Sequence, residues 1–376
     1  MKHIKGLDTL RAFAVFFVII QHFGVWFDDT SFSGKFIKEI LIPDGGWGVH
    51  LFFVLSGFLI TSILLTAKNG AVAGGNGAII GRFYLRRALR IFPVYYFLLL
   101  ILCFSSYPDI RDNIWHCATY TLNIFCYRAN LWNNISHTWT LCVEEQFYLV
   151  WPIFMIMLPD RCLKYLFATL IITGIVSTYV SSEVQHHFAP LLVFHSFDAF
   201  GIGGLLACAY RNGEGTIGYD RSINKMAAIA LIVYLYWKIA MFLSYPHIYG
   251  MYLVKTVDSV LALWIIVKVV NNKSKFAERY LLGNRFLNYI GKISYGVYLY
   301  HYVYLNGYCS RVGDHLVKIT ARQPFINALL RDHHFTYWMH VAIMIGIASL
   351  SYHLIELPIL QFKDRLSYTD DPVLSA

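Results

Sequence analysis

The sequence contains little charge. Only 14% of its 376 residues are Asp, Glu, Lys or Arg, whereas 57% are hydrophobic and 17% aromatic. An ordinary soluble domain has roughly 45–50% apolar and about 25% charged residues. The formal net charge is +9, yet no run of five or more basic residues occurs, so we expect no nucleic-acid partner. The composition predicts an integral membrane protein surrounded by a lipid bilayer.

Signals for a metal or redox site are absent too. The seven cysteines include no Cys-x-x-Cys pair, and no histidine stands at zinc-ligand spacing from them. We therefore expect no metal. Cys117 and Cys126 share a loop that we place outside the cytoplasm, where a disulfide is possible.

The chain also lacks an internal repeat, and no linker or change of composition sets off a soluble domain. Its first apolar segment is too long for a signal peptide and has no small-x-small cleavage site, so we expect it to be retained. We expect one membrane domain, residues 1–362, and a short cytoplasmic tail, residues 363–376.

Apolar stretches near the roughly 20 residues that cross a bilayer fill most of the chain. They predict an all-α, polytopic helical bundle of about ten transmembrane helices, and Ile114–Tyr127 is a candidate interfacial or re-entrant element. Because Lys and Arg collect in alternate loops, the positive-inside rule places both termini in the cytoplasm. The predicted spans are 9–27, 48–66, 91–106, 143–158, 163–180, 190–210, 226–244, 252–270, 287–308 and 337–358.

The first span carries Arg11 at its start and His22 well inside it. An Arg at bilayer depth costs roughly 2.5–3.5 kcal/mol or more. Eleven residues correspond to about 1100° of rotation and a rise of about 16 Å, so both side chains lie on one helix face. Either Arg11 reaches the cytoplasmic interface and His22 bonds a neighbouring helix, or the two form part of a functional site.

Three arginines precede the third span. Arg86 and Arg90 are four residues apart and share a helix face, so with Arg87 they could hold a phosphate. The alternative is a positive-inside anchor, with Pro93 starting the helix. Position alone favours the anchor.

Acidic residues stand at the extracytoplasmic mouth of the fourth span. Glu144 and Glu145 either complement the positive end of a helix dipole or, with the nearby Tyr148, bind sugar hydroxyls. In the second span, Ser56-Gly57 lacks the frame of a nucleophile elbow, and close helix packing explains it better.

A polar stripe follows one face of the ninth span. Ser294, Tyr298 and His301 are spaced i, i+4, i+7, so this face should meet the protein interior or a wet cavity. Three further acids lie at depth, and we expect each to pair with a basic residue of its own helix. The expected pairs are Asp198 with His195, Asp258 with Lys255, and Glu356 with His353.

Taken in order, these stretches resemble the acyltransferase 3 family of bacterial membrane O-acyltransferases, which includes O-antigen acetylases. The resemblance runs from about Lys5 to Pro358. Its motifs are the Arg-x10-His of Arg11 and His22, Gly48–Leu59, the Arg-x-x-Arg of Arg87 and Arg90, Arg90–Tyr96, Trp139–Pro152 and Ser294–His301. Thr140 stands where Ser is usual, and His50 where the family often has a small or acidic residue.

The resemblance implies transfer of an acyl group, most often acetyl, from cytoplasmic acyl-CoA to a hydroxyl of an envelope carbohydrate such as O-antigen, other lipopolysaccharide parts or exopolysaccharide. It places the protein in the bacterial inner membrane. Arg11, Arg86, Arg87 and Arg90 would bind donor phosphates, and a pantetheine arm would cover the distance from Arg11 to His22.

In this reading His22 acts as the general base, or is transiently acylated, and Glu145 assists it. A histidine held away from water is expected to stay uncharged at pH 7, as a base requires. Glu144, Tyr148, Ser294, Tyr298 and His301 would line the acceptor cavity. An alternative from another class is a transporter or flippase of a lipid-linked sugar, although many transporters show the internal repeat that this chain lacks.

Overall fold

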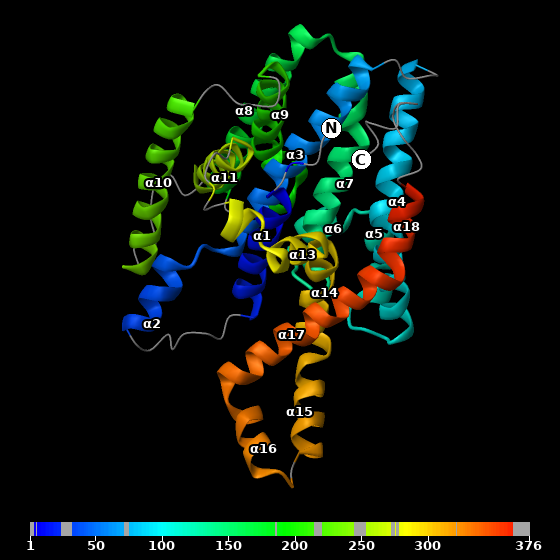
Figure 1. The fold of residues 1–376 in the computed structure, drawn as a ribbon, viewed down its shortest axis with the longest axis vertical. Coiled ribbons are helices and arrows are strands. Elements are labelled where there is room, and N and C mark those ends of the chain that lie inside the picture. Colours follow the sequence, from blue (N-terminus) through cyan, green and yellow to red (C-terminus); the bar gives the residue numbers. More distant parts are fainter. Residues whose placement is uncertain are drawn as a thin grey trace.

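The computed structural model describes residues 4, 6–23, 32–70, 75–184, 186–213, 220–243, 253–271, 275, 278–320 and 322–363. Over these residues the secondary structure is helical, without a strand (Figure 1). Seven helical segments among them are long and apolar enough to cross a bilayer. The prediction of a polytopic helical bundle is therefore confirmed.

Those seven segments hold the long helices of the bundle. They are α3 (Gly45–Asn69), α4 (Gly75–Phe104), α7 (Trp139–Met157), α8 (Asp160–Val184), α9 (Phe197–Asn212), α10 (Asp220–Phe242) and α17 (His333–Ser351).

The other three predicted spans are helical but shorter than 18 residues in the described part of the chain. α1 (Leu7–Phe23) and α11 (Val254–Val270) have 17 residues each, and α14 (Ser294–Gly307) has 14. The ninth span was predicted as one helix over 287–308. It is divided instead, because α13 (Arg285–Lys292) ends at Lys292 and α14 begins at Ser294, with Ile293 between them.

The third predicted span began too late. α4 starts at Gly75, so Arg86, Arg87 and Arg90 lie inside a helix of 30 residues rather than in front of one. Pro93 is also inside α4 and does not start it. A proline removes one backbone hydrogen bond, but membrane helices tolerate this when neighbouring groups compensate.

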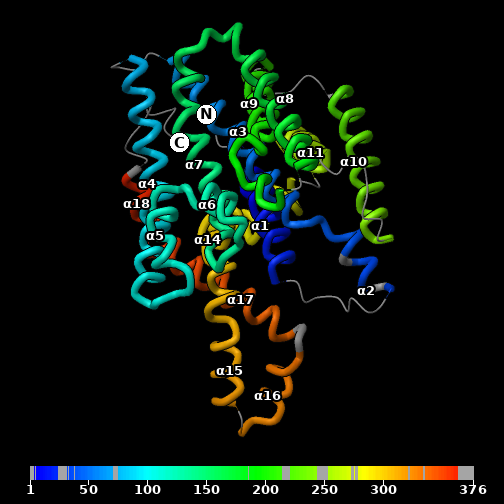
Figure 2. The backbone as a smooth tube through the Cα atoms, turned by 180° about the vertical axis from the view of Figure 1, so that it is seen from behind, coloured from blue at the N-terminus to red at the C-terminus, as the bar shows by residue number. Residues whose placement is uncertain are grey.

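Short helices cover one end of the bundle. α5 (Ile110–Ala118) and α6 (Leu122–Ala129) confirm an extra helical element in the 114–127 region. Cys117 and Cys126 are free thiols, and the Cys126 Sγ lies 3.2 Å from the Ser136 Oγ, so no disulfide joins them. α15 (Cys309–Ile319) and α16 (Pro324–Arg331) form a hairpin that projects from the same end (Figures 1 and 2).

α3 lies at the centre and packs against α1, α9 and α11. Its approach to α9 depends on two glycines. A Cβ at Gly57 would lie 2.6 Å from the Phe200 carbonyl oxygen, and one at Gly203 would meet the Val54 carbonyl oxygen. The expectation that small residues here serve helix packing is confirmed for Gly57.

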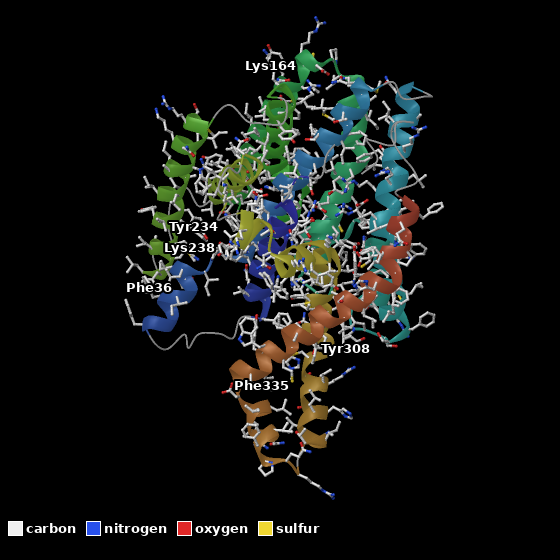
Figure 3. All side chains as sticks on the ribbon, in the orientation of Figure 1. Phe36, Lys164, Tyr234, Lys238, Tyr308 and Phe335 are labelled. Carbon is white, nitrogen blue, oxygen red and sulfur yellow. The ribbon has the colours of Figure 1, made fainter. Side chains whose placement is uncertain are left out.

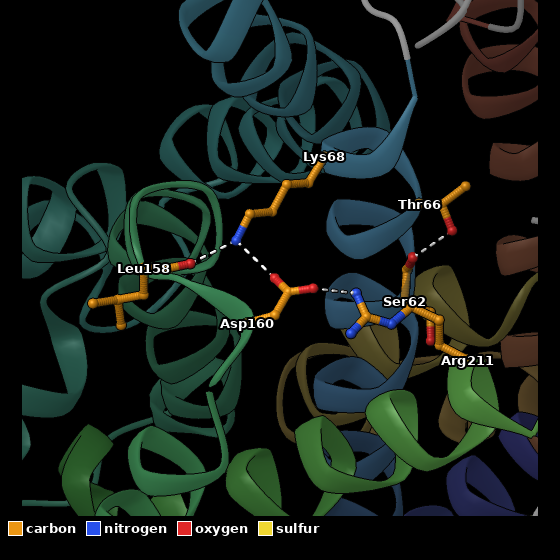
Figure 4. Close-up of polar contacts among 6 residues, drawn as sticks. All are labelled: Ser62, Thr66, Lys68, Leu158, Asp160 and Arg211. Carbon is orange, nitrogen blue, oxygen red and sulfur yellow. Dashed lines mark hydrogen bonds and ion pairs between the residues drawn. The ribbon is translucent and has the colours of Figure 1, made fainter. Parts of the chain in front are cut away.

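A three-residue ionic contact joins the ends of α3, α8 and α9 (Figure 4). The Lys68 Nζ lies 3.0 Å from the Asp160 Oδ1, and the Arg211 Nη1 lies 2.9 Å from the Asp160 Oδ2. Lys68 also donates to the Leu158 carbonyl oxygen at 2.5 Å. The contact joins α8 and α9 to α3, the central helix of the bundle.

α10 stands at the edge of the bundle beside α11 and the short α2 (Phe32–Phe36), as Figures 1 and 3 show. Its Lys238, labelled in Figure 3, is buried and donates to the Ile42 carbonyl oxygen at 3.0 Å. This places α10 away from the polar residues that α1, α4, α7 and α14 bring together.

Candidate active site

Helix α1 connects two groups of polar side chains. Arg11 lies near its start, where the Nη1 is 2.6 Å from the Asp8 Oδ1. His22 lies in its last turn. The eleven residues between them correspond to about 16 Å along the axis, and the unbroken helix preserves the shared face that the sequence predicts.

Arginines gather around the first group. Arg90 interacts electrostatically with Arg11 and Arg87, which are the basic residues that act on it most strongly. Arg86, which we also assigned to the donor, is not among these strongest partners. Arg90 stands midway along α4, and part of its surface is exposed.

Carboxylates offset these cations. Glu144 interacts with Arg87 and Arg90, and Glu356 interacts with Arg90. We expected Glu356 to pair with His353 of its own helix, which is wrong: it lies in η7 (Tyr352–Glu356) and acts on α4 instead, while His353 approaches the Tyr289 hydroxyl at 3.3 Å. We call the set Asp8, Arg11, Arg87, Arg90, Glu144 and Glu356 the arginine centre.

A hydroxyl of α3 organises the acid of α7. The Ser56 Oγ donates to the Glu144 Oε1 at 2.8 Å and accepts from the Tyr148 hydroxyl at 3.0 Å. The Arg87 guanidinium lies over the Tyr148 ring, 5.1 Å from its centre. Ser56 is therefore a site residue that the sequence led us to read as packing only.

The second acid has different surroundings. The Glu145 Oε1 is buried without a hydrogen-bond partner in the described residues. The carboxylate interacts electrostatically with Glu144 and Arg87, and with the hydroxyls of Tyr96, Tyr120 and Tyr295. The structure therefore brings both acids next to the arginines, whereas we had placed the acids on the acceptor side and the arginines on the donor side.

A cavity of about 320 Å³ opens beside the start of α1. Asp8 lines it and at the same time pairs with Arg11, so the cavity meets the arginine centre. Its other lining residues come from the start of α1, from η6 (Glu278–Leu282) and its end, and from α13: Gly6, Glu278, Leu282, Gly283, Asn288 and Lys292.

The second group of α1 is a set of imidazoles. The ring centre of His22 lies 5.1 Å from that of His301 and 5.1 Å from that of Tyr302. His137, in the short helix η2 (Ser136–Thr138), completes the set, with its ring centre 5.4 Å from that of His301. We call His22, His137, His301 and Tyr302 the histidine cluster.

The sequence analysis missed His137 and Tyr302. His137 stands two residues before the predicted Trp139–Pro152 motif, and Tyr302 directly follows the predicted stripe. A histidine next to a motif already assigned to the site was a usable signal in the sequence. The contacts among three separate helices could not be predicted from the sequence.

The predicted stripe of α14 divides into different roles. His301 belongs to the histidine cluster, whereas the Tyr298 hydroxyl donates to the His137 carbonyl oxygen at 2.7 Å and accepts from Thr140 at 2.6 Å. Tyr298 thus fastens α14 to the start of α7. Ser294 is buried at the first turn of α14, as expected for a face that meets the interior.

Another polar network lies between α3, α9 and α11. The His50 Nδ1 is 3.1 Å from the Ser259 Oγ, and Asp198 accepts from Thr256 at 2.9 Å. Asp198 and Asp258 both interact electrostatically with Lys255. The Asp258 Oδ1 has no hydrogen-bond partner in the described residues, so the expected pairing of Asp258 with Lys255 stays a prediction. The Ser259 hydroxyl also lies 3.4 Å from the Asp198 Oδ2. The serine therefore stands between the acid and the imidazole, whereas in a catalytic triad the imidazole is central.

The arrangement separates a charged group from a set of imidazoles along one helix. Guanidinium groups bind phosphates, and a neutral imidazole accepts a proton. No group of three or more His, Cys, Asp or Glu side chains in the described residues could hold a metal ion. The chemistry available is therefore anion binding at one end of α1 and proton transfer at the other.

Comparison with known proteins agrees with this chemistry. A family model described as an acyltransferase domain matches residues 4–348, nearly the whole chain. No solved structure gives a significant match.

Three curated proteins illustrate the similarity. The peptidoglycan O-acetyltransferase OatA of Listeria monocytogenes is 27% identical over 396 residues, which cover 95% of this chain and 56% of that protein. A Staphylococcus aureus (strain COL) protein named "Putative O-acetyltransferase SACOL0978" is 27% identical over 389 residues, 95% of this chain and 57% of its own. Bacillus subtilis YrhL is 26% identical over 392 residues, 95% of this chain and 55% of its own. This chain therefore spans little more than half the length of these relatives.

Proposed function

The chain belongs to the acyltransferase 3 family, and we propose that it transfers an acetyl group from cytoplasmic acetyl-CoA to a hydroxyl of a cell-envelope carbohydrate. Its location would be the bacterial plasma membrane, which it crosses several times. The observation that carries this proposal is α1, which joins the arginine centre to the histidine cluster on one helix face.

The arginine centre fits the donor. Arg90 is partly exposed, and Arg11 and Arg87 are near it, so forked donors can meet the phosphates of a nucleotide. The adjoining cavity of about 320 Å³ offers room beside Asp8 and Lys292. Asp8, Glu144 and Glu356 hold the arginines in place, and donor phosphates would have to compete with them.

The histidine cluster fits the transfer step. The acceptor hydroxyl attacks the thioester carbon, a C–O bond forms, the C–S bond breaks, and the sulfur leaves as the thiol of CoA after it takes a proton. His22 takes the proton from the attacking hydroxyl as general base. Glu144 belongs to the arginine centre and Glu145 lies beside it, so we assign both acids to orienting the arginines rather than to binding the sugar.

The acceptor is a sugar polymer in this proposal. We considered O-antigen and exopolysaccharide from the sequence, and the names of two relatives add peptidoglycan. All three present sugar hydroxyls, so the same cluster serves each of them. Mass spectrometry of envelope glycans from cells with and without the protein would identify the acyl group by the mass it adds, and the acceptor polymer as the glycan that shows this difference.

The test of the mechanism is replacement of His22 by Ala in purified protein. We expect the transfer rate to fall by about 10²–10⁴, the usual contribution of general base catalysis, while acetyl-CoA still binds. A matched control is His195→Ala, since His195 is buried outside the site and its two ring nitrogens already face the hydroxyls of Thr178 and Ser181. Full activity of the His22 variant would refute the assignment.

A further inference from the structure

Two histidines of the cluster have their protons fixed by backbone groups. The His301 Nδ1 lies 2.5 Å from the Tyr298 carbonyl oxygen, and the His137 Nε2 lies 3.2 Å from the Leu299 carbonyl oxygen. A carbonyl oxygen only accepts hydrogen bonds, so in each pair the ring nitrogen must carry the hydrogen. This assigns the Nδ1–H form to His301 and the Nε2–H form to His137.

The opposite nitrogen of each ring is then a hydrogen-bond acceptor. Both of these nitrogens, the His301 Nε2 and the His137 Nδ1, are buried without a partner in the described residues. The side chains are 0% and 1% exposed. An unsatisfied buried polar atom is unfavourable, by about 1–3 kcal/mol for a typical group, so native proteins seldom keep one without a purpose.

The two acceptor nitrogens belong to neighbouring rings that pack edge to face. The ring centres are 5.4 Å apart and the ring planes are nearly perpendicular, at 85°. The other ring neighbours of these two residues are His22, Tyr298 and Tyr302. Among the described residues, the titratable groups that act electrostatically on the two imidazoles are His22 and, for His301, also His137, with no carboxylate among them; the cluster therefore offers neutral acceptors and aromatic faces rather than a counter-ion for a protonated amine.

We propose that His137 and His301 are acceptor-binding residues that each receive a hydrogen bond from a different hydroxyl of one sugar ring. His22 acts on the hydroxyl that reacts. Tyr302, whose hydroxyl accepts from the Trp132 Nε1 at 2.8 Å, supplies a fixed aromatic face beside them. This inference rests on the proposed function and adds the residues that orient the acceptor: two neutral imidazoles, each of which accepts from a different hydroxyl of the same ring.

The experiment compares acceptors that differ by one hydroxyl. Purified full-length protein in lipid nanodiscs would be assayed with acetyl-CoA and an N-acetylhexosamine oligosaccharide, together with its monodeoxy analogues. For wild-type protein, two of the deoxy analogues should lose about tenfold or more in kcat/KM, because each leaves one imidazole nitrogen unpaired.

Variants then assign each hydroxyl to a residue. In His137→Phe, kcat/KM for the parent sugar should fall about tenfold through the acceptor KM, with the KM for acetyl-CoA unchanged. The penalty for one of the two deoxy analogues should vanish in that variant, as a double-mutant cycle requires for a direct contact. His137→Gln, which restores an accepting oxygen, should recover part of the loss and serves as the variant of choice if the Phe variant does not fold.

Each outcome bears on the proposal. Equal deoxy penalties in wild-type and His137 variants, or an unchanged acceptor KM in both, would overturn it while leaving the proposed function intact. If the wild-type protein transfers acetyl to no carbohydrate, the proposed function and this inference fall together. His195→Gln is the matched control and should change neither KM.

Discussion

The two ends of α1 hold buried polar groups in different electrostatic surroundings. In the arginine centre, charged side chains lie near charges of the other sign: Arg11 forms an ion pair with Asp8, and Glu356 interacts electrostatically with Arg90, although the Glu356 Oε1 has no hydrogen-bond partner in the described residues. In the histidine cluster the buried groups are neutral, and two ring nitrogens have no partner in the described residues. A balanced ionic site can exchange one anion for another, whereas an unsatisfied neutral site gains most when a hydroxyl arrives.

After the loss expected for His22→Ala, the largest effect should come from replacing Arg90. Arg90→Gln removes a charged hydrogen-bond donor and leaves Glu356 without its cation. A hydrogen bond to a charged group contributes about 1.5–3 kcal/mol, so the KM for acetyl-CoA should rise about 10- to 100-fold with little change in the acceptor KM. Steady-state kinetics checks this.

The double variant Arg90→Gln with Glu356→Gln is the control, because it removes the uncompensated acid together with the cation. It should fold better than the single variant and still bind the donor weakly. Normal donor affinity in either variant would show that Arg90 serves the fold alone.

A smaller loss is expected at Glu144. Glu144→Gln keeps an oxygen for the Ser56 hydroxyl but removes the charge that faces Arg87. We expect about a tenfold fall in kcat/KM, because Arg87 then lacks its orienting anion. Ser56→Ala should lower activity in the same direction, and a non-additive double variant would confirm that the two residues act as one unit.

Near the histidine cluster, a smaller effect is expected from replacing Tyr298, which anchors α14 to the start of α7. Tyr298→Phe removes the hydroxyl that joins Thr140 to the His137 carbonyl oxygen. The free energy of unfolding should fall by about 1–2 kcal/mol, since buried groups lose their partner. A thermal unfolding scan measures the effect, and an unchanged midpoint would contradict the anchoring role.

The smallest effect, of opposite sign, is expected at Asp8. Asp8→Asn frees Arg11 from its ion pair, and partly exposed pairs are worth about 0.2–1 kcal/mol. Binding of acetyl-CoA should therefore tighten about two- to fivefold, which calorimetric titration can resolve. Weaker binding would mean that Asp8 positions Arg11 rather than competing with the phosphates.

The apolar runs of the sequence predicted most helices, because the bilayer requires a long uninterrupted apolar segment. They failed at α4, where the first half carries Arg82, Arg86, Arg87 and Arg90 and so falls below the hydropathy of a span. Two of those side chains, Arg87 and Arg90, interact there with carboxylates of α7 and η7. Such contacts are tertiary and leave no local pattern.

The same limit applies to the site. Arg11 and His22 could be predicted because helical periodicity alone places them on one face. Glu356 beside Arg90, Ser56 beside Glu144, and His137 beside His301 each involve residues far apart in the sequence. Their pairing depends on helix packing, and no spacing rule predicts it.

The close approach of α3 and α9 has a consequence for behaviour in different membranes. At Gly57 and Gly203 the two backbones touch without intervening side chains, so their separation is set by atomic radii alone. Bilayers differ in thickness, and helices commonly respond by tilting. Two helices in direct backbone contact, joined to α8 at one end by Asp160, must tilt together. The depth of Ser56, which precedes Gly57 in α3, relative to Gly203 of α9 should therefore be insensitive to lipid chain length.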